Sequence, residues 1–230
     1  MIIIDIETSG INPIKNSILS IGAVDFSNSQ NQFYGECRWE GGEIDPRALN
    51  VNGFTLENIT SSKKKNLKEI LLDFQTWMDP IEDQTFGGHN LGAFDIPFLI
   101  NSLKRKNLLQ YFNFNGENPK FGKRTVDLHS EVYSSHLKRG IEIPLKHKMS
   151  YLNSTNALVY TGLPKEPMPH NALTGAKMEA EALSRLICGK NLLEEYKKYE
   201  IPKYLLENKK EEKKPIDLNY RLSLFLKNKN

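Results

Sequence analysis

The chain has 230 residues, of which 39% are hydrophobic and 26% are charged. This composition is typical of a globular protein with one substantial core, and no apolar run is long enough to span a bilayer. The early Asp5 excludes a signal peptide, and the two cysteines have no metal-binding spacing. We therefore expect a reduced, cytoplasmic protein.

The net charge of +3 is unevenly distributed along the chain. Residues from 203 onward carry eight Lys or Arg and four Asp or Glu, whereas the preceding residues are close to neutral. We predict one domain over residues 1–202, a charged linker over 203–215 and a separate tail over 216–230. A weak overall basicity is compatible with nucleic-acid binding but does not predict it alone.

The first ten residues place two acids in a predicted buried strand. Three isoleucines lead into Asp5 and Glu7, which share one face of a strand, about 7 Å apart along the chain. Two unpaired carboxylates at the end of a core strand repel each other and lose hydration. A divalent cation would relieve that repulsion, and oxygen ligands favour Mg²⁺ or Mn²⁺. The alternative interpretation is a pair of solvated acids on an edge strand.

Strands and helices alternate along the rest of the chain. Strands are predicted at 17–26 and 32–39, with a polar hairpin loop between them, and a short helix opens at Asp45-Pro46. Three strands in antiparallel order, followed by alternating helices and strands, predict a mixed sheet covered on both faces. The later predicted elements are helices at 66–78, 94–106, 128–137, 151–159 and 172–187, and strands at 85–88 and 124–127.

Two later segments place chemically active side chains at the starts of helices. Asp95 begins the predicted helix 94–106, where the helix dipole favours a carboxylate, although simple capping would also explain it. His170 follows a proline-rich loop and precedes the helix 172–187, so it could face a cleft and exchange a proton near neutral pH. A structural histidine is the alternative.

Taken together and in order, these segments resemble the three motifs of the DnaQ-like 3′–5′ exonucleases, in the branch known as DEDDh. The resemblance covers residues 1–190. It implies a ribonuclease H-like, three-layer α/β/α fold with a mixed five-stranded sheet. The segments that carry it are Asp5-Ile-Glu-Thr-Ser-Gly10, His89-Asn90 with Phe94-Asp95, and His170-Asn-Ala-Leu173, with further matches at 20–24, 51–55 and 152–162.

The resemblance also implies a role for each matching position. Asp5 would bridge two metal ions, Glu7 would bind the first and Asp95 the second, while His170 would take a proton from the attacking water. Three further residues, Thr8, Phe54 and Asn90, match positions near the terminal nucleotide. Phe54 would stack on a base, or else belong to the core.

One position departs from the family pattern. The fourth metal-binding acid is expected five residues after the histidine, and this chain has Gly175 there, so the two-metal site lacks one ligand. Glu179, one turn further along the same helix face, would reach back to the metal. Alternatively, the chain is a nuclease-fold binding protein with impaired catalysis, or the glycine is a deliberate inactivating change.

The tail resembles a short peptide by which bacterial replication and repair proteins bind the sliding clamp. Leu222, Leu224 and Phe225 would be the anchors that dock on a clamp or a polymerase, although a terminal segment that packs on its own core would show a similar pattern. The prediction is a metal-dependent 3′–5′ exonuclease for nucleic-acid 3′ ends, with DNA favoured over RNA, in proofreading or repair. The alternatives are a non-catalytic nucleic-acid-binding or clamp-associated factor, and an enzyme that processes oligoribonucleotides.

Overall fold

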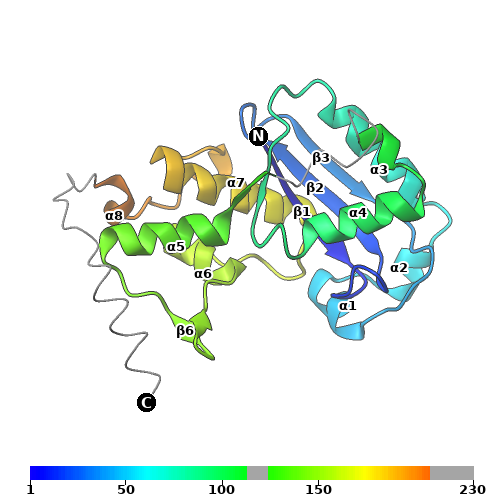
Figure 1. Ribbon diagram of the computed structural model, residues 1–230, viewed down its shortest axis with the longest axis horizontal. Coiled ribbons are helices and arrows are strands. Elements are labelled where there is room, and N and C mark those ends of the chain that lie inside the picture. Colours follow the sequence, from blue (N-terminus) through cyan, green and yellow to red (C-terminus); the bar gives the residue numbers. More distant parts are fainter. Residues whose placement is uncertain (113–123, 208–230) are drawn as a thin grey trace, which may run out of the picture.

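The computed structural model describes residues 1–112 and 124–207 of the chain. Its centre is a mixed five-stranded sheet of order β3-β2-β1-β4-β5 (Figure 1). The first three strands are antiparallel, and the last two run parallel to β1. Their bounds are β1 (Ile2–Thr8), β2 (Ile18–Asp25), β3 (Gln32–Glu36), β4 (Phe86–Gly88) and β5 (Thr125–Asp127).

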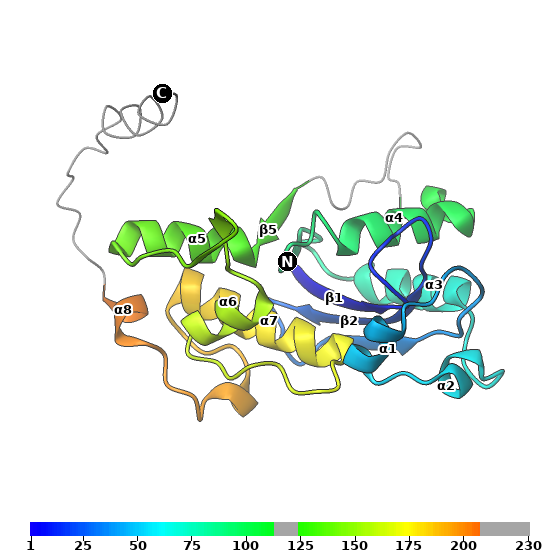
Figure 2. The same cartoon turned by 90° about the horizontal axis from the view of Figure 1, so that it is seen from below.

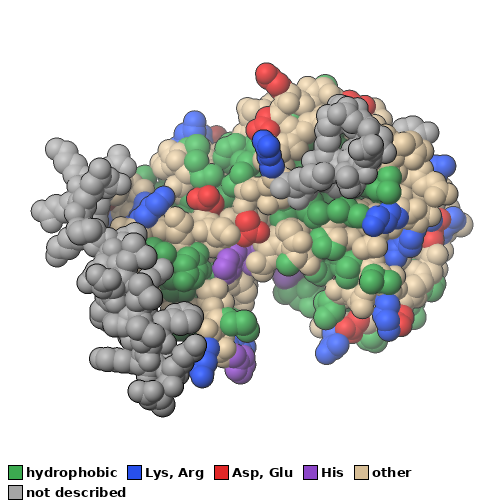
Figure 3. Space-filling view, viewed as in Figure 1, with side chains coloured by type: hydrophobic (Ala, Val, Ile, Leu, Met, Phe, Trp, Pro, Cys, Tyr) green, Lys and Arg blue, Asp and Glu red, His purple; other side chains and the backbone are tan. Residues whose placement is uncertain are grey.

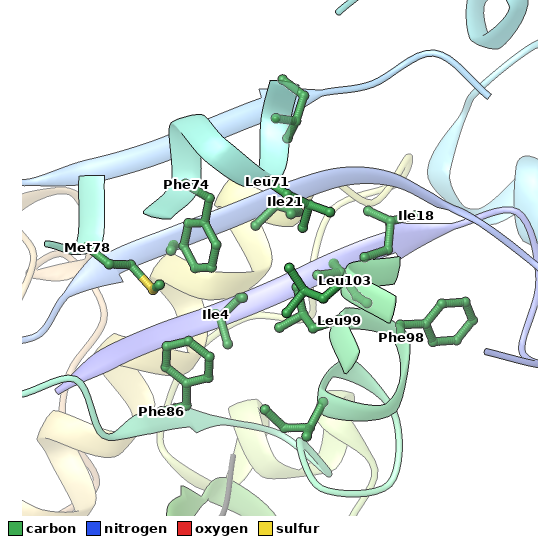
Figure 4. Packing of buried hydrophobic residues seen from close by; sticks show 14 of the residues in the cluster. Ile4, Ile18, Ile21, Leu71, Phe74, Met78, Phe86, Phe98, Leu99 and Leu103 are labelled. Carbon is green, nitrogen blue, oxygen red and sulfur yellow. The ribbon is translucent and has the colours of Figure 1, made fainter. Parts of the chain in front are cut away.

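Helices cover both faces of this sheet, and β1 contributes to both layers because successive side chains of a strand point to opposite sides. Ile2, Ile4 and Ile6 pack under α3 (Leu67–Met78) and α4 (Asp95–Arg105), in the cluster drawn in Figure 4. Ile3 belongs to the opposite layer, formed by α5 (Leu128–Arg139), α6 (Ser154–Tyr160) and α7 (Ala172–Cys188). Figure 2 shows α4 and α7 on opposite sides of the strands. The expected mixed sheet, covered on both faces, is therefore confirmed.

Helix α7 lies unusually close to the sheet at its N-terminal end. A Cβ atom on Gly22 of β2 would lie 2.2 Å from the backbone of Ala172. Only glycine permits this approach, because any side chain would push the helix away. The close contact fixes the start of α7, and with it His170 just before the helix, relative to the strands.

The C-terminal half of α7 is tied down by a buried ion pair. Arg185 is fully buried, and its Nε donates to Oε1 of Glu181 at 2.8 Å. The other oxygen of Glu181 accepts the backbone N–H groups of Leu192 and Leu193, while Arg185 donates to the carbonyl oxygen of Thr161. A buried pair is tolerated when its remaining donors and acceptors are satisfied in this way.

Most predicted elements are present, with small shifts at their ends. The predicted strand 32–39 ends at Glu36, and the predicted helix 151–159 begins at Ser154, where Asn153 caps it. The sequence did not indicate several short elements. They are α2 (Leu56–Thr60), the hairpin of β6 (Leu145–Lys146) and β7 (Met149–Ser150), α8 (Lys203–Leu206), and 3₁₀ turns at Leu109–Phe112 and Glu194–Tyr196; α1 (Pro46–Asn52) was expected.

The predicted linker begins with a short packed segment. Residues 203–206 form α8, in which Leu205 is buried and the carbonyl oxygen of Tyr204 accepts from Nε of Arg139. The rest of the linker and the whole tail, including the proposed anchors Leu222, Leu224 and Phe225, lie outside the described residues. Within the described ranges, no helix is long and apolar enough to cross a membrane.

Candidate functional site

A cleft of about 600 Å³ opens at the carboxyl end of the central strand β1. Figure 3 shows the surface hollowed between the part that carries α6 and the part that carries α1. The cleft gathers acids from five separate segments of the chain. Its ionisable lining residues are Asp5, Glu7, Asp45, Arg47, His89, Asp95, Glu166, His170 and Glu179.

The alternation of β1 directs its two acids toward the layer of α7. Asp5 and Glu7 follow Ile3 on that face, as the strand pattern predicts. Gly175 on α7 lies directly against Asp5, and a Cβ on this glycine would be only 2.0 Å from Oδ2 of Asp5. The Asp5 carboxylate therefore occupies the space that a side chain at position 175 would fill, and it packs directly against α7.

Glu179 lies one helical turn beyond Gly175 and is buried. Its Oε2 accepts the backbone N–H of His89 at 3.0 Å. Burial raises the pKa of Asp5 well above its usual value, and the Glu179 carboxylate is the nearby charge that adds most to this shift. The structure thus brings Glu179 to the acids of β1, in the cleft where Gly175 provides none.

Asp95 is the first residue of α4, as predicted, but its side chain does not cap the helix. The N-cap residue is Phe94, which makes no side-chain capping bond. Asp95 is buried, and its Oδ1 has no hydrogen-bond partner. Burial raises the pKa of Asp95 to about 8, although the backbone N–H groups of Asp95 and Ile6 oppose the shift. Such an orphaned carboxylate oxygen, directed into an acidic cleft, is the kind of atom that a cation would satisfy.

His170 lines the cleft with its side chain 35% exposed, and its backbone N–H donates to the carbonyl oxygen of Val51. Its Nδ1 lies 3.5 Å from Oε2 of Glu166. Ligand atoms of Glu7, Glu166 and His170 all lie within 4.8 Å of one another. The imidazole therefore faces carboxylates instead of packed hydrocarbon.

Glu166 is the acid beside Glu7 and His170 that the sequence did not predict to belong to the site. It lies between Pro164 and Pro167 in the loop before His170. Nothing in this loop has a helical or strand period, so its side-chain direction could not be read from the sequence. An acid four residues before a candidate histidine was the only available signal.

The three residues predicted near a terminal nucleotide are not all in one place. Thr8 and Asn90 line the cleft, where the Thr8 hydroxyl donates to the carbonyl oxygen of Gly10. Phe54 lines a neighbouring cavity of about 340 Å³, and Nζ of Lys64 lies 4.7 Å from its ring centre. The half-buried Phe54 also lies outside both core clusters, so it is not the plain core residue of the alternative interpretation.

The charges in the cleft are poorly balanced. Burial, followed by the Glu166 and Asp95 carboxylates, raises the pKa of Glu7 to about 8. Burial likewise raises the pKa values of Glu166 and Glu179. Of the described residues that line the cleft, Arg47 alone carries a permanent positive charge, and it pairs with Asp45. So many carboxylate oxygens in one cleft suit the binding of Mg²⁺ or Mn²⁺. Without a bound cation, the carboxyl groups of the cleft retain protons.

This imbalance predicts how stability depends on pH when metal is removed. Acids whose pKa is raised by folding stabilise the folded state fully below pH about 4, where the unfolded carboxyls are still protonated. That contribution is lost as pH rises toward about 8, where Glu7 and Asp95 ionise in the folded chain. A shift of one pKa unit in one group corresponds to about 1.4 kcal/mol. In EDTA we therefore expect the free energy of unfolding to fall by more than about 1.4 kcal/mol between pH about 5.5 and 8.

Urea unfolding at several pH values, with EDTA or with saturating Mn²⁺, measures this dependence. Mn²⁺ is expected to reduce the fall, because it compensates the charges that ionisation exposes. A stability that rises with pH in EDTA over this interval would contradict the described electrostatics of the cleft.

Fold and cleft together define the class of protein: a ribonuclease H-like α/β chain with a carboxylate site at the end of its central strand. The chain belongs to the exonuclease family, because the RNase T family model, described as Exonuclease, matches residues 2–183. It is 29% identical over 189 residues to the 3′-5′ DNA exonuclease Cap18 of Escherichia coli, covering 80% of this chain and 89% of that protein.

Solved structures show the same fold at low sequence identity. Exonuclease I of E. coli in complex with a dT13 oligonucleotide superimposes with a TM-score of 0.60 at 15% identity, over 80% of this chain. The cell-death related nuclease 4 (CRN-4) gives a TM-score of 0.59 at 16% identity, over 83% of this chain and 64% of its own. This chain spans only 40% of the length of exonuclease I.

Proposed function

We propose that the protein is a divalent-metal-dependent 3′–5′ exonuclease that removes nucleotides from DNA 3′ ends. The observation that carries this proposal is the convergence of Asp5, Glu7, Asp95 and Glu179 with His170 in one cleft. Family membership supports hydrolysis of nucleic acid. The 3′–5′ direction and the preference for DNA are supported by the similarity to the DNA exonuclease Cap18, which covers most of both chains.

The four acids would hold Mg²⁺ or Mn²⁺ through their carboxylate oxygens. When bound, the cations supply the positive charge that polarises the scissile phosphodiester and stabilises the departing 3′-oxygen. Oδ1 of Asp95 has no hydrogen-bond partner and is available to a cation. The carboxylate of Asp5, on β1, lies against Gly175 of α7. Glu179 would provide the carboxylate that Gly175 does not.

His170 would accept the proton of the attacking water. Its ring lies at the cleft with Nδ1 toward Glu166, which leaves Nε2 as the atom available for the water. Thr8 and Asn90 would contact the terminal nucleotide, since they line the same cleft. Phe54, in the neighbouring cavity, would meet a more distant part of the substrate if it stacks on a base at all.

A labelled oligonucleotide tests the function directly. With Mg²⁺ or Mn²⁺, we expect 3′-labelled single-stranded DNA to release labelled mononucleotide first, and 5′-labelled DNA to shorten stepwise. EDTA should abolish both reactions, because without the cations nothing neutralises the acids around the phosphate. The same oligonucleotide made of RNA reports the sugar preference.

Binding without turnover would favour the second candidate function, a non-catalytic nucleic-acid-binding factor. The feature on its side is Gly175, which leaves the family's acid pattern incomplete. Release of mononucleotide only from the 5′ end, or activity unaffected by EDTA, would overturn the proposed mechanism.

A role in proofreading or repair, with the tail docked on a sliding clamp or a polymerase, is a further part of the proposal. It rests on the sequence of residues 220–226 alone. Deleting residues 216–230 would then remove clamp capture in a pull-down and leave thermal stability unchanged, whereas a loss of stability would favour packing of the tail on its own domain.

A further inference from the structure

Glu166 is an acid that the proposed roles do not use. Its side chain is only 10% exposed, although it lies on a loop between α6 and α7. One oxygen, Oε2, lies 3.5 Å from Nδ1 of His170. The other, Oε1, is buried without a hydrogen-bond partner. A buried carboxylate oxygen with no hydrogen-bond donor costs free energy unless a water or an ion binds it.

The surroundings of Glu166 indicate what that partner is. Ligand atoms of Glu7, Glu166 and His170 lie within 4.8 Å of one another. Oxygen and nitrogen ligands at about 2.1 Å from one small divalent cation are separated by up to about 4.2 Å, so small side-chain movements would close this group around an ion. The permanent cation of the cleft, Arg47, has a side chain that is 89% exposed and paired with Asp45.

We propose that Glu166 is a further metal ligand, which holds a divalent cation together with Glu7, in addition to the carboxylate that Glu179 would provide. Its Oε1 is the atom for the cation, and its Oε2 holds the His170 ring beside it. One side chain would thus set the distance between the cation and the base. This inference rests on the proposed function, since it requires a metal-binding cleft.

The test compares Glu166→Gln with Glu142→Gln in the full-length chain. The first substitution keeps the size of the side chain and an oxygen for His170 but removes the charge, while Glu142 is exposed and lies outside the cleft. Mn²⁺ titration followed by electron paramagnetic resonance counts bound ions. We expect Glu166→Gln to weaken one Mn²⁺ by about tenfold or more, or to lose it, and Glu142→Gln to match the unmodified protein.

Thermal unfolding supplies a second readout, which a purely structural role would move in the opposite direction. In EDTA, Glu166→Gln should unfold at the same or a higher temperature, because it removes one of several mutually repelling acids. Its stabilisation by Mn²⁺ should be smaller than that of the unmodified chain.

Unchanged Mn²⁺ binding by Glu166→Gln overturns the inference, and so does a lower unfolding temperature in EDTA with normal Mn²⁺ binding. Equal loss in the Glu142→Gln control also overturns it. If the unmodified protein itself binds no Mn²⁺, the proposed function fails and this inference fails with it. If the unmodified protein binds Mn²⁺ and Glu166→Gln binds it equally well, only this inference fails.

Discussion

Asp5→Asn is expected to abolish exonuclease activity, with a loss of at least about 100- to 1,000-fold. Asp5 lies at the centre of the cluster: it contacts Gly175, and the charges of Glu179, Glu7 and Asp95 all raise its pKa. Asparagine has nearly the same shape but is a neutral, weaker ligand. The initial rate of mononucleotide release from 3′-labelled DNA, at saturating Mn²⁺, measures the loss.

The same substitution should stabilise the metal-free protein. In EDTA, Asp5 must either ionise among other acids or remain protonated, and asparagine removes that cost. We therefore expect a higher unfolding temperature for Asp5→Asn in EDTA and a smaller rise on adding Mn²⁺. Asp79→Asn, at an exposed acid that ends α3, is the control and should change neither quantity. Retained activity, or a marked loss of stability in EDTA, would show that Asp5 serves the fold and not the metal.

Gly175→Ala is the second change with a large expected effect. Alanine in place of glycine inside a helix normally stabilises it by about 1 kcal/mol. Here the added Cβ would lie 2.0 Å from Oδ2 and 2.9 Å from Cγ of Asp5. The carboxylate must therefore move, and a shift of about 1 Å in a catalytic group costs on the order of 100-fold in rate.

Three measurements distinguish this effect from simple misfolding. Gly175→Ala should retain a cooperative unfolding transition, bind Mn²⁺ more weakly and lose exonuclease activity together. Gly92→Ala is the matched control, since a Cβ there would meet nothing within 4 Å. Full activity of Gly175→Ala would mean that Asp5 needs no defined position against α7, which contradicts the site as described. The geometry also means that any larger residue at 175 requires Asp5 to move.

The parts of the site that the sequence predicted are those with a local period or a local boundary. Asp5 and Glu7 follow the two-residue period of a buried strand, and Asp95 begins a helix as expected. His170 precedes α7, where the loop and the helix pattern meet. The structure brings all four to one cleft. Their catalytic roles remain predictions that the experiments above test.

The parts that the sequence could not predict depend on distances between elements. The sequence showed that Gly175 lacks a carboxylate, but not that its missing side chain makes room for Asp5. The sequence indicated that the Glu179 side chain could reach the acids of the first strand. Only the packing of α7 against β1 shows that Glu179 and these acids line one cleft. Phe54 matched a substrate position, yet it lies in the neighbouring cavity.

The sequence by itself thus determined the succession of the main strands and helices along the chain and the sheet covered on both faces, because these follow from local patterns of side chains. Only the tertiary structure decided which acids meet. Glu166 has no local pattern, and it enters the cleft because the loop between α6 and α7 turns back toward β1. Electrostatic repulsion and metal binding depend on separations of a few ångströms between residues distant in the chain, and no local pattern encodes those separations.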